Sequence, residues 1–239
     1  MSRRFSSLKD DPKSKLQQEI VSKSVWKIKL AASISAIAFL LFLLHFSLGN
    51  RETPSVNSPT NAYGTQPLVL KEGDPYIRAL MRTISASEAN DRRPYSIIYG
   101  GDHVSDLSNH PNRCMPILVG PNIGNCSTAA GRYQMINTTW DEKAKRYHPR
   151  PSGFMFWKSY SFEPEYQDAV VYAWLKDPQA WGVDISELLR QGKINQVLKL
   201  LYGTWTSLGY GIEDNSMSSK LPTIYKKMLR EELRQENSK

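Results

Sequence analysis

Glu88 is the residue of this sequence whose position best suits acid chemistry. An apolar series recurs at the spacing of one helical face, and Glu88 is its next member. The series consists of Ile77, Leu80, Met81 and Ile84. Burial and the nearby helix C-terminus both raise the pKa of a carboxyl group, and one that stays protonated near neutral pH can be a general acid. A solvated residue at a frayed helix end is the alternative interpretation.

The other chemically active residue types form no recognisable site. Asp91, Asp102 and Asp106 follow Glu88 in stretches typical of turns and loops. No Ser-His-Asp or Cys-His arrangement can be assembled, and Cys and His do not occur at metal-binding spacing. Phosphate-loop and dinucleotide patterns are absent from the sequence as well. We therefore expect neither a metal nor a cofactor.

The elements around Glu88 are predicted to be mainly helical. Asp74 followed by Pro75 favours a helix start, and helical patterns return around 138–147, 163–176, 184–202 and 220–235. Thr138 and Asp141 resemble a capping box. Strand-forming residues at 95–99 precede Gly100-Gly101-Asp102, which predicts one β-hairpin. The fold class is thus mainly α with a small β-hairpin, and residues 108–128 are expected to form a loop.

Large aromatic and sulfur-containing residues have structural interpretations. Trp140, Trp174 and Trp205 lie in helical patterns and are expected in the core. Cys114 and Cys126 are the only cysteines, and a disulfide between them could contribute ~3 kcal/mol by closing a short loop. Two free thiols remain the alternative.

The formal net charge of +8 is concentrated at the N-terminus. Residues 1–29 hold eight basic and three acidic residues, a net charge of +5, whereas residues 75–239 carry only +4. This distribution disfavours a basic nucleic-acid-binding domain and indicates a charged tail.

Residues 30–48 form an uninterrupted apolar run without formal charge. At ~1.5 Å per residue it would extend about 28 Å, close to the thickness of the bilayer hydrocarbon core. We expect a transmembrane helix, because a cleaved signal peptide normally has a shorter charged region and apolar run. Residues 1–29 would then be a cytoplasmic tail by the positive-inside rule, and the rest of the chain would lie outside. Residues 49–73 read as a flexible linker to a domain over 74–239.

Several short motifs occur in order along the chain: Ser87-Glu88, YSIIYGG (95–101), DLSNHP (106–111), AGRYQMINTTWDE (130–142), SFEPEYQDAV (161–170) and TWTSLGYG (204–211). Together they resemble the lambda-phage-type endolysin family of lysozyme-like lytic transglycosylases. A single motif such as Gly-Arg-Tyr-Gln is weak evidence, whereas the ordered set including the acid is specific. The resemblance covers roughly residues 75–230.

This resemblance implies a lysozyme-like fold with two lobes flanking a cleft. It also implies cleavage of the MurNAc–GlcNAc β-1,4 bond of peptidoglycan with formation of 1,6-anhydro-muramic ends. Glu88 matches the family's catalytic acid, and Tyr133, Gln134 and Tyr210 match residues expected to bind the glycan strand. Without the motif, the sequence favours a core aromatic at Tyr133. Gln134 could bond to backbone at a helix start, and Tyr210 could be a turn residue packed on the surface. Asp168 is expected to support structure.

The chain also departs from the family pattern. Ala89 stands where Gly usually follows the acid, and the segment with Phe154, Phe156 and Trp157 differs from the phage form. The predicted anchor suggests cell-wall remodelling from a bacterial inner membrane, with a monomeric catalytic domain in the periplasm. One alternative is a hydrolytic muramidase, which needs a second acid such as Asp91, Asp102 or Asp106 across the sugar. The other is an inactive wall-binding protein of the same fold.

Overall fold

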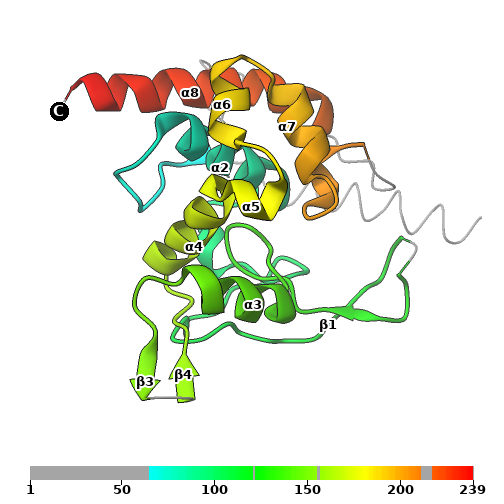
Figure 1. The fold of residues 1–239 in the computed structure, drawn as a ribbon. Helices are drawn as coiled ribbons and strands as arrows, with labels where there is room; N and C mark the ends of the chain where they lie inside the picture. The colour runs from blue at the N-terminus through cyan, green and yellow to red at the C-terminus, as the bar shows by residue number, and fades with distance from the viewer. Residues whose placement is uncertain (1–64, 121, 155–156, 211–216, 239) are drawn as a thin grey trace, which may run out of the picture. The chain divides into compact units, whose positions relative to one another are not determined.

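The computed structural model describes residues 65–120, 122–154, 157–210 and 217–238 (Figure 1). The helices are α2 (Pro75–Glu88), α3 (Asn137–Tyr147), α4 (Pro164–Lys176), α5 (Pro178–Trp181), α6 (Ile185–Arg190), α7 (Ile194–Leu201) and α8 (Leu221–Asn237). Short 3-10 helices are η2 (Pro94–Ser96), η3 (Thr206–Leu208) and η4 (Ser218–Lys220). The strands are β1 (Met115–Pro116), β2 (Cys126–Ser127), β3 (Ser152–Phe154) and β4 (Trp157–Ser159). The mainly helical prediction is confirmed.

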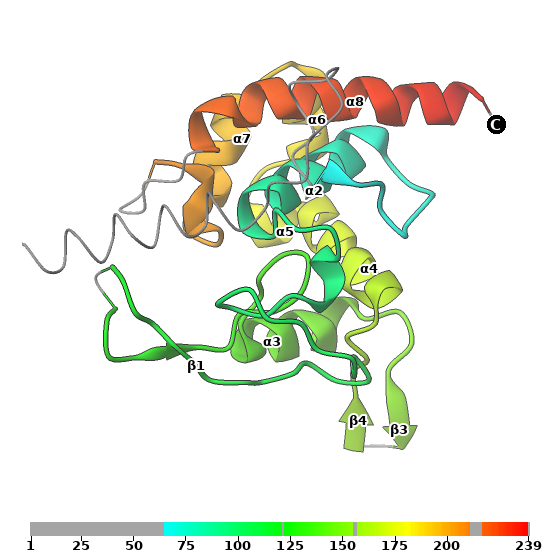
Figure 2. The same cartoon turned by 180° about the vertical axis from the view of Figure 1, so that it is seen from behind.

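Helix α2 is the central element of the domain. It packs most extensively against α8 and also contacts α4, α6 and η3. Figures 1 and 2 show α8 along one side of α2, with α4 leading from α2 toward α3 on the other. The predicted helix start is confirmed, because the Asp74 side chain accepts a hydrogen bond from the Tyr76 N–H. The side chains of the apolar series before Glu88 are fully buried.

A buried ion cluster joins α2 to α8. Arg78 Nε lies 2.7 Å from Glu232 Oε2, and Arg82 contacts Glu232 Oε1 at 2.7 Å and Glu231 at 2.6 Å. Both arginines and Glu232 are buried. Because each buried charge has an opposite partner, the cluster fixes how the two helices pack.

Residues before the predicted start of the domain at residue 74 already contact this ion cluster. The Thr65 carbonyl accepts hydrogen bonds from Arg82, and Leu68 is only 2% exposed. Contacts with the domain therefore begin within the predicted linker over 49–73, through Leu68 and through the carbonyl of Thr65, although Val69 is 45% exposed. Residues 1–64, including the expected tail and the 30–48 segment, lie outside the described residues. Within the described ranges, no helix is long and apolar enough to cross a membrane.

The helix expected over 184–202 consists of two helices. Gly192 adopts φ 74° between α6 and α7, and its N–H bonds to the Leu189 carbonyl at 3.0 Å. A left-handed glycine ends a helix, so the apolar pattern alone overestimated its length. The capping box at Thr138 is also wrong, because α3 begins one residue earlier and the Asn137 N–H bonds to Thr128 Oγ1 at 3.1 Å.

The β-hairpins lie at other positions in the sequence than the predicted one. Residues 97 and 103 form only an antiparallel bridge, because η2 occupies Pro94–Ser96. Two-stranded antiparallel hairpins instead lie at β1–β2 and β3–β4. The former falls within the predicted loop 108–128 and carries the disulfide between Cys114 and Cys126, which confirms that pairing. The Phe156 position and the side chains of Phe154 and Trp157 lie outside the described part of the structure.

Candidate active site

Glu88 is the last residue of α2 and is half-buried. The helix ends there because Ala89 leaves helical geometry, with φ −136° and ψ 63°, while its N–H still bonds to the Ser85 carbonyl. Ser207 Oγ donates a hydrogen bond to Glu88 Oε1. The carboxyl group expected on the buried side of α2 is thus at the edge of the core, where it has a hydroxyl partner.

Ser207 is itself held from two sides. Its side chain belongs to η3 and the residue is 7% exposed. Its carbonyl accepts a 2.8 Å hydrogen bond from Ser87 Oγ and a 3.0 Å bond from Ser218 Oγ. Because these bonds restrain the Ser207 backbone, the position of the hydroxyl donor relative to Glu88 is fixed. Sequence reasoning missed Ser207, since a serine in a short irregular segment carries no periodic signal.

The turn that carries Gln134 is joined to the same segment. Trp205 Nε1 donates a 3.0 Å hydrogen bond to the Tyr133 carbonyl, and Trp205 lies two residues before Ser207. One short stretch of chain therefore contacts both the end of α2 and the Gly-Arg-Tyr-Gln turn. As expected, Trp205 is buried, and so are Trp140 and Trp174.

The Gly-Arg-Tyr-Gln turn is closed by a bridge between Ala130 and Met135. Gly131 adopts φ 72°, and a Cβ atom there would lie 2.3 Å from Gln167 Oε1. Gln134 has φ 44° and is half-buried, and its Nε2 donates to the Gly131 carbonyl at 2.9 Å. The side chain thus supports its own turn, as the alternative interpretation proposed, and its contact with sugar stays a prediction.

Tyr133 lies in the core and not on a surface. It is 1% exposed, and its hydroxyl donates a 2.6 Å hydrogen bond to Asp168 Oδ1. Burial raises its pKa well above the ordinary value, as does the charge of Asp168. The ring is enclosed by protein, as in the core-aromatic alternative, and contact of Tyr133 with the glycan strand stays a prediction.

Asp168 is the centre of a buried polar network. It also accepts hydrogen bonds from the Tyr95 hydroxyl at 2.7 Å and from the Leu70 N–H at 3.1 Å. Burial raises the pKa of Asp168, while Arg132 and the hydrogen-bond donors oppose the shift. The expected structural role agrees with this geometry. The sequence holds the same kind of signal for Asp168 as for Glu88, which is an acid on the apolar face of a helix. Asp168, Val171 and Leu175 lie on one such face.

Tyr210 and the remaining acids have separate surroundings. Tyr210 follows η3, is 53% exposed, and lines a hollow of about 280 Å³ with Leu198 and Pro222. Asp91, three residues after Glu88, accepts a 2.6 Å bond from the Arg93 N–H and lies 3.4 Å from His103 Nε2. Asp102 is exposed, and Asp106 lines a different hollow, described below. No group of three or more potential metal ligands occurs among the described residues.

The fold places this chain in the lysozyme-like class, with a half-buried carboxyl group at the end of its central helix. Accordingly, the fold is similar to the solved structure of bacteriophage lambda lysozyme complexed with a chitohexasaccharide. That likeness has a TM-score of 0.50 and 26% identity, and covers 66% of this chain and 96% of the other.

The family follows from the sequence comparison. The family model described as Endolysin matches residues 78–230, and the chain belongs to this endolysin family. The endolysin of Escherichia phage lambda is 30% identical over 120 residues, covering 49% of this chain. The match spans 64% of the length of that phage protein. The family resemblance predicted from the ordered motifs is confirmed.

Proposed function

We propose that this protein is a peptidoglycan lytic transglycosylase that cleaves the MurNAc–GlcNAc β-1,4 bond and forms 1,6-anhydro-muramic ends. The observation that carries the proposal is Glu88, half-buried at the end of α2 with Ser207 donating to one carboxyl oxygen. Membership of the endolysin family and the glycan-bound lambda lysozyme structure support the substrate class.

The chemistry needs only one carboxyl group. Glu88 protonates the glycosidic oxygen as positive charge develops at C1 of the muramic sugar, and the leaving sugar departs as an alcohol. The resulting carboxylate takes the proton from the C6 hydroxyl of the same sugar, whose oxygen attacks C1 and closes the anhydro ring. Because this nucleophile is intramolecular, its effective concentration replaces the second carboxylate of paired-acid glycosidases. The substrate N-acetyl group stabilises the cationic carbon.

Product analysis of digested peptidoglycan tests the proposal. Mass spectrometry should find anhydro-muramic ends with the full chain, and Glu88→Gln should abolish turnover while the domain stays folded. Glu236→Gln, an exposed acid at the end of α8, is the matched control and should cleave normally. Full cleavage by Glu88→Gln would refute the catalytic assignment. Folded wild-type protein that binds sacculi without cleaving them would be an inactive wall-binding relative.

A hydrolytic muramidase is the second candidate, and Asp91 is the observation that favours it. Its carboxyl group lies in the loop directly after Glu88 and contacts His103. A retaining or inverting hydrolase requires such a second acid beside the sugar. Reducing muramic ends among the products, together with their loss in Asp91→Asn, would establish this mechanism in place of the transglycosylase.

We also propose that residues 30–48 anchor the enzyme in a bacterial inner membrane with its catalytic domain in the periplasm. The apolar length of this segment and the basic residues before it support the orientation. Cell fractionation should find the chain in the membrane fraction, and deletion of 30–48 should release it. Protease added to intact spheroplasts should digest the domain; protection from that protease would reverse the orientation. Elution from size-exclusion chromatography in detergent tests the expected monomer.

A further inference from the structure

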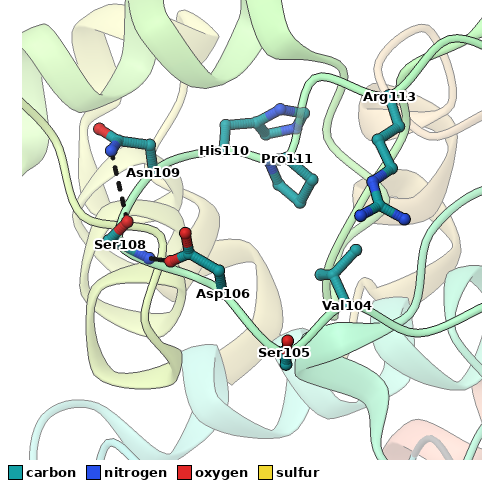
Figure 3. A pocket seen from close by; sticks show the side chains of 8 residues that line it. All are labelled: Val104, Ser105, Asp106, Ser108, Asn109, His110, Pro111 and Arg113. Atoms are coloured by element: carbon teal, nitrogen blue, oxygen red, sulfur yellow. Dashed lines mark hydrogen bonds between the residues drawn. The ribbon is translucent and has the colours of Figure 1, made fainter.

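The loop before β1 encloses a hollow that the catalytic proposal does not use. The hollow has a volume of about 220 Å³, and its lining comes from residues 104–113 (Figure 3). Asp106 lies near Ser108 and Asn109 on one side of it, Arg113 lies near Val104 on the other, and Ser105 supplies a further hydroxyl. A hollow of this size suits one amino-acid-sized group and not a whole disaccharide.

The two charges differ in how they are held. Asp106 Oδ1 accepts a 2.9 Å hydrogen bond from the Ser108 N–H, and hydrogen bonds from Ser108 lower the pKa of Asp106. It is therefore a carboxylate at neutral pH. Within the described residues, no hydrogen bond or ion pair engages the Arg113 guanidinium. A planar guanidinium presents donors in the geometry that binds a carboxylate by two parallel hydrogen bonds.

Both ends of this loop are attached to the candidate active site. His103, next to Val104, lies 3.4 Å from Asp91, which follows Glu88 by three residues. His110 Nε2 donates a 2.8 Å hydrogen bond to the Met135 carbonyl, directly after Gln134. The loop that lines the hollow is thus linked through His103 to the segment after Glu88 and through His110 to the residue after Gln134. These links are the reason to consider substituents of the glycan strand as ligands of the hollow.

The charge pattern selects a ligand class. The glycan strand itself carries no cationic group, whereas its stem peptides carry carboxylates and, in diaminopimelate-containing walls, a free amine. We propose that the hollow is a subsite for the stem peptide, with Arg113 binding a carboxylate and Asp106 an ammonium group. This inference rests on the proposed function for its substrate, but it concerns a site separate from Glu88. The serine hydroxyls and Asn109 amide would hydrogen-bond to the peptide backbone.

Direct binding tests the inference without cleavage. The probe is the free stem tetrapeptide L-alanyl-γ-D-glutamyl-meso-diaminopimelyl-D-alanine, titrated into the full chain in detergent and followed by calorimetry or NMR. Removing one charge-assisted contact at an exposed site should weaken binding about fivefold to tenfold in Arg113→Ala, and similarly in Asp106→Asn. Arg150→Ala is the matched control, because Arg150 is an exposed arginine outside the hollow, and it should bind as the wild type does.

Cleavage assays separate this inference from the proposed function. Arg113→Ala should lower kcat/KM on intact sacculi by a similar factor and leave unchanged the rate on glycan strands stripped of stems by an amidase. The subsite would be overturned if the wild type and Arg113→Ala bound the tetrapeptide equally, or if the wild type did not bind it. Cleavage of stripped strands would still support the proposed enzyme activity in that case. Tetrapeptide binding without cleavage of either substrate would uphold the subsite and refute the proposed activity.

Discussion

Ser207 donates a hydrogen bond to Glu88 Oε1 across 119 positions of sequence. The bond joins η3 to the last residue of α2, and the Ser207 carbonyl is held by Ser87 and Ser218. A carboxyl group that must exchange a proton with a glycosidic oxygen needs a fixed orientation, because small displacements of catalytic groups cost large factors in rate. Ser207 is therefore the positioning residue for the proposed acid.

Removing the Ser207 hydroxyl should impair the chemical step more than substrate binding. We expect Ser207→Ala to lower kcat about tenfold, since one hydrogen bond to a charged group contributes about 1.5 kcal/mol or more, with KM nearly unchanged. Ser207→Thr keeps the hydroxyl and should recover part of the rate. Ser238→Ala, at an exposed serine directly after α8, is the control for steady-state kinetics. An unchanged kcat in Ser207→Ala would remove Ser207 from the mechanism.

Asp168→Asn should destabilise the fold. The two carboxylate oxygens of Asp168 accept hydrogen bonds from Tyr133, Tyr95 and Leu70, and in the variant an NH₂ group replaces one of these oxygens. The substitution also removes the negative charge that faces buried Arg132. Breaking a buried charge arrangement costs about 3 kcal/mol. Urea denaturation measures the free energy of unfolding, with exposed Asp141→Asn as the control. Coincident unfolding curves for wild type and Asp168→Asn would show that the network contributes nothing.

Gly131 and Gly192 provide a matched test of backbone and packing effects. Their φ angles are 72° and 74°, so alanine at either position costs about 1–2 kcal/mol in the left-handed region. Only at Gly131 would the new Cβ also meet other atoms, with Gln167 Oε1 at 2.3 Å and Phe162 Cζ at 2.7 Å. Gly131→Ala should therefore lower the thermal unfolding midpoint clearly more than Gly192→Ala. Equal shifts would mean that the turn can relax away from Gln167.

His110 should make stability depend on pH. Burial lowers its pKa below the ordinary value of 6.5, and the Met135 carbonyl and the charge of Asp141 only partly oppose this. Nε2 donates to Met135 while Nδ1 accepts from the Asn112 N–H at 3.1 Å, an arrangement that needs the neutral ring.

The unfolded chain therefore takes up the proton at a higher pH than the folded one. The His110 contribution is present above about pH 6.5 and is lost as pH falls through the lowered folded-state pKa. Denaturation from pH 7.5 to 5 should show a smaller loss of stability for His110→Gln than for the wild type. His148 shifts in the same direction, so the double variant should flatten the curve further. Parallel wild-type and His110→Gln curves would contradict this explanation.

The boundaries of the helices and strands show which features can be predicted from local sequence patterns. The start of α2 at Asp74-Pro75 and the burial of its apolar face were predictable, because capping and helical periodicity act within a few residues. The break at Gly192 was missed, since apolar residues on both sides of it continue the same spacing. Hairpins as short as β1–β2 have too few residues to establish an alternating pattern, and a disulfide holds that one.

The family, the mainly helical composition and the position of Glu88 on the inner face of its helix were predictable from the residues alone. The enclosure of Tyr133 beside Asp168, the contact of Ser207 with Glu88, and the hollow shared by Asp106 and Arg113 became known only from the three-dimensional contacts. The difference comes from the range over which the interactions act. Helix propensity and amphipathic spacing are local, whereas hydrogen bonds between Ser207 and Glu88 depend on how α2 and η3 pack, which no periodic signal records.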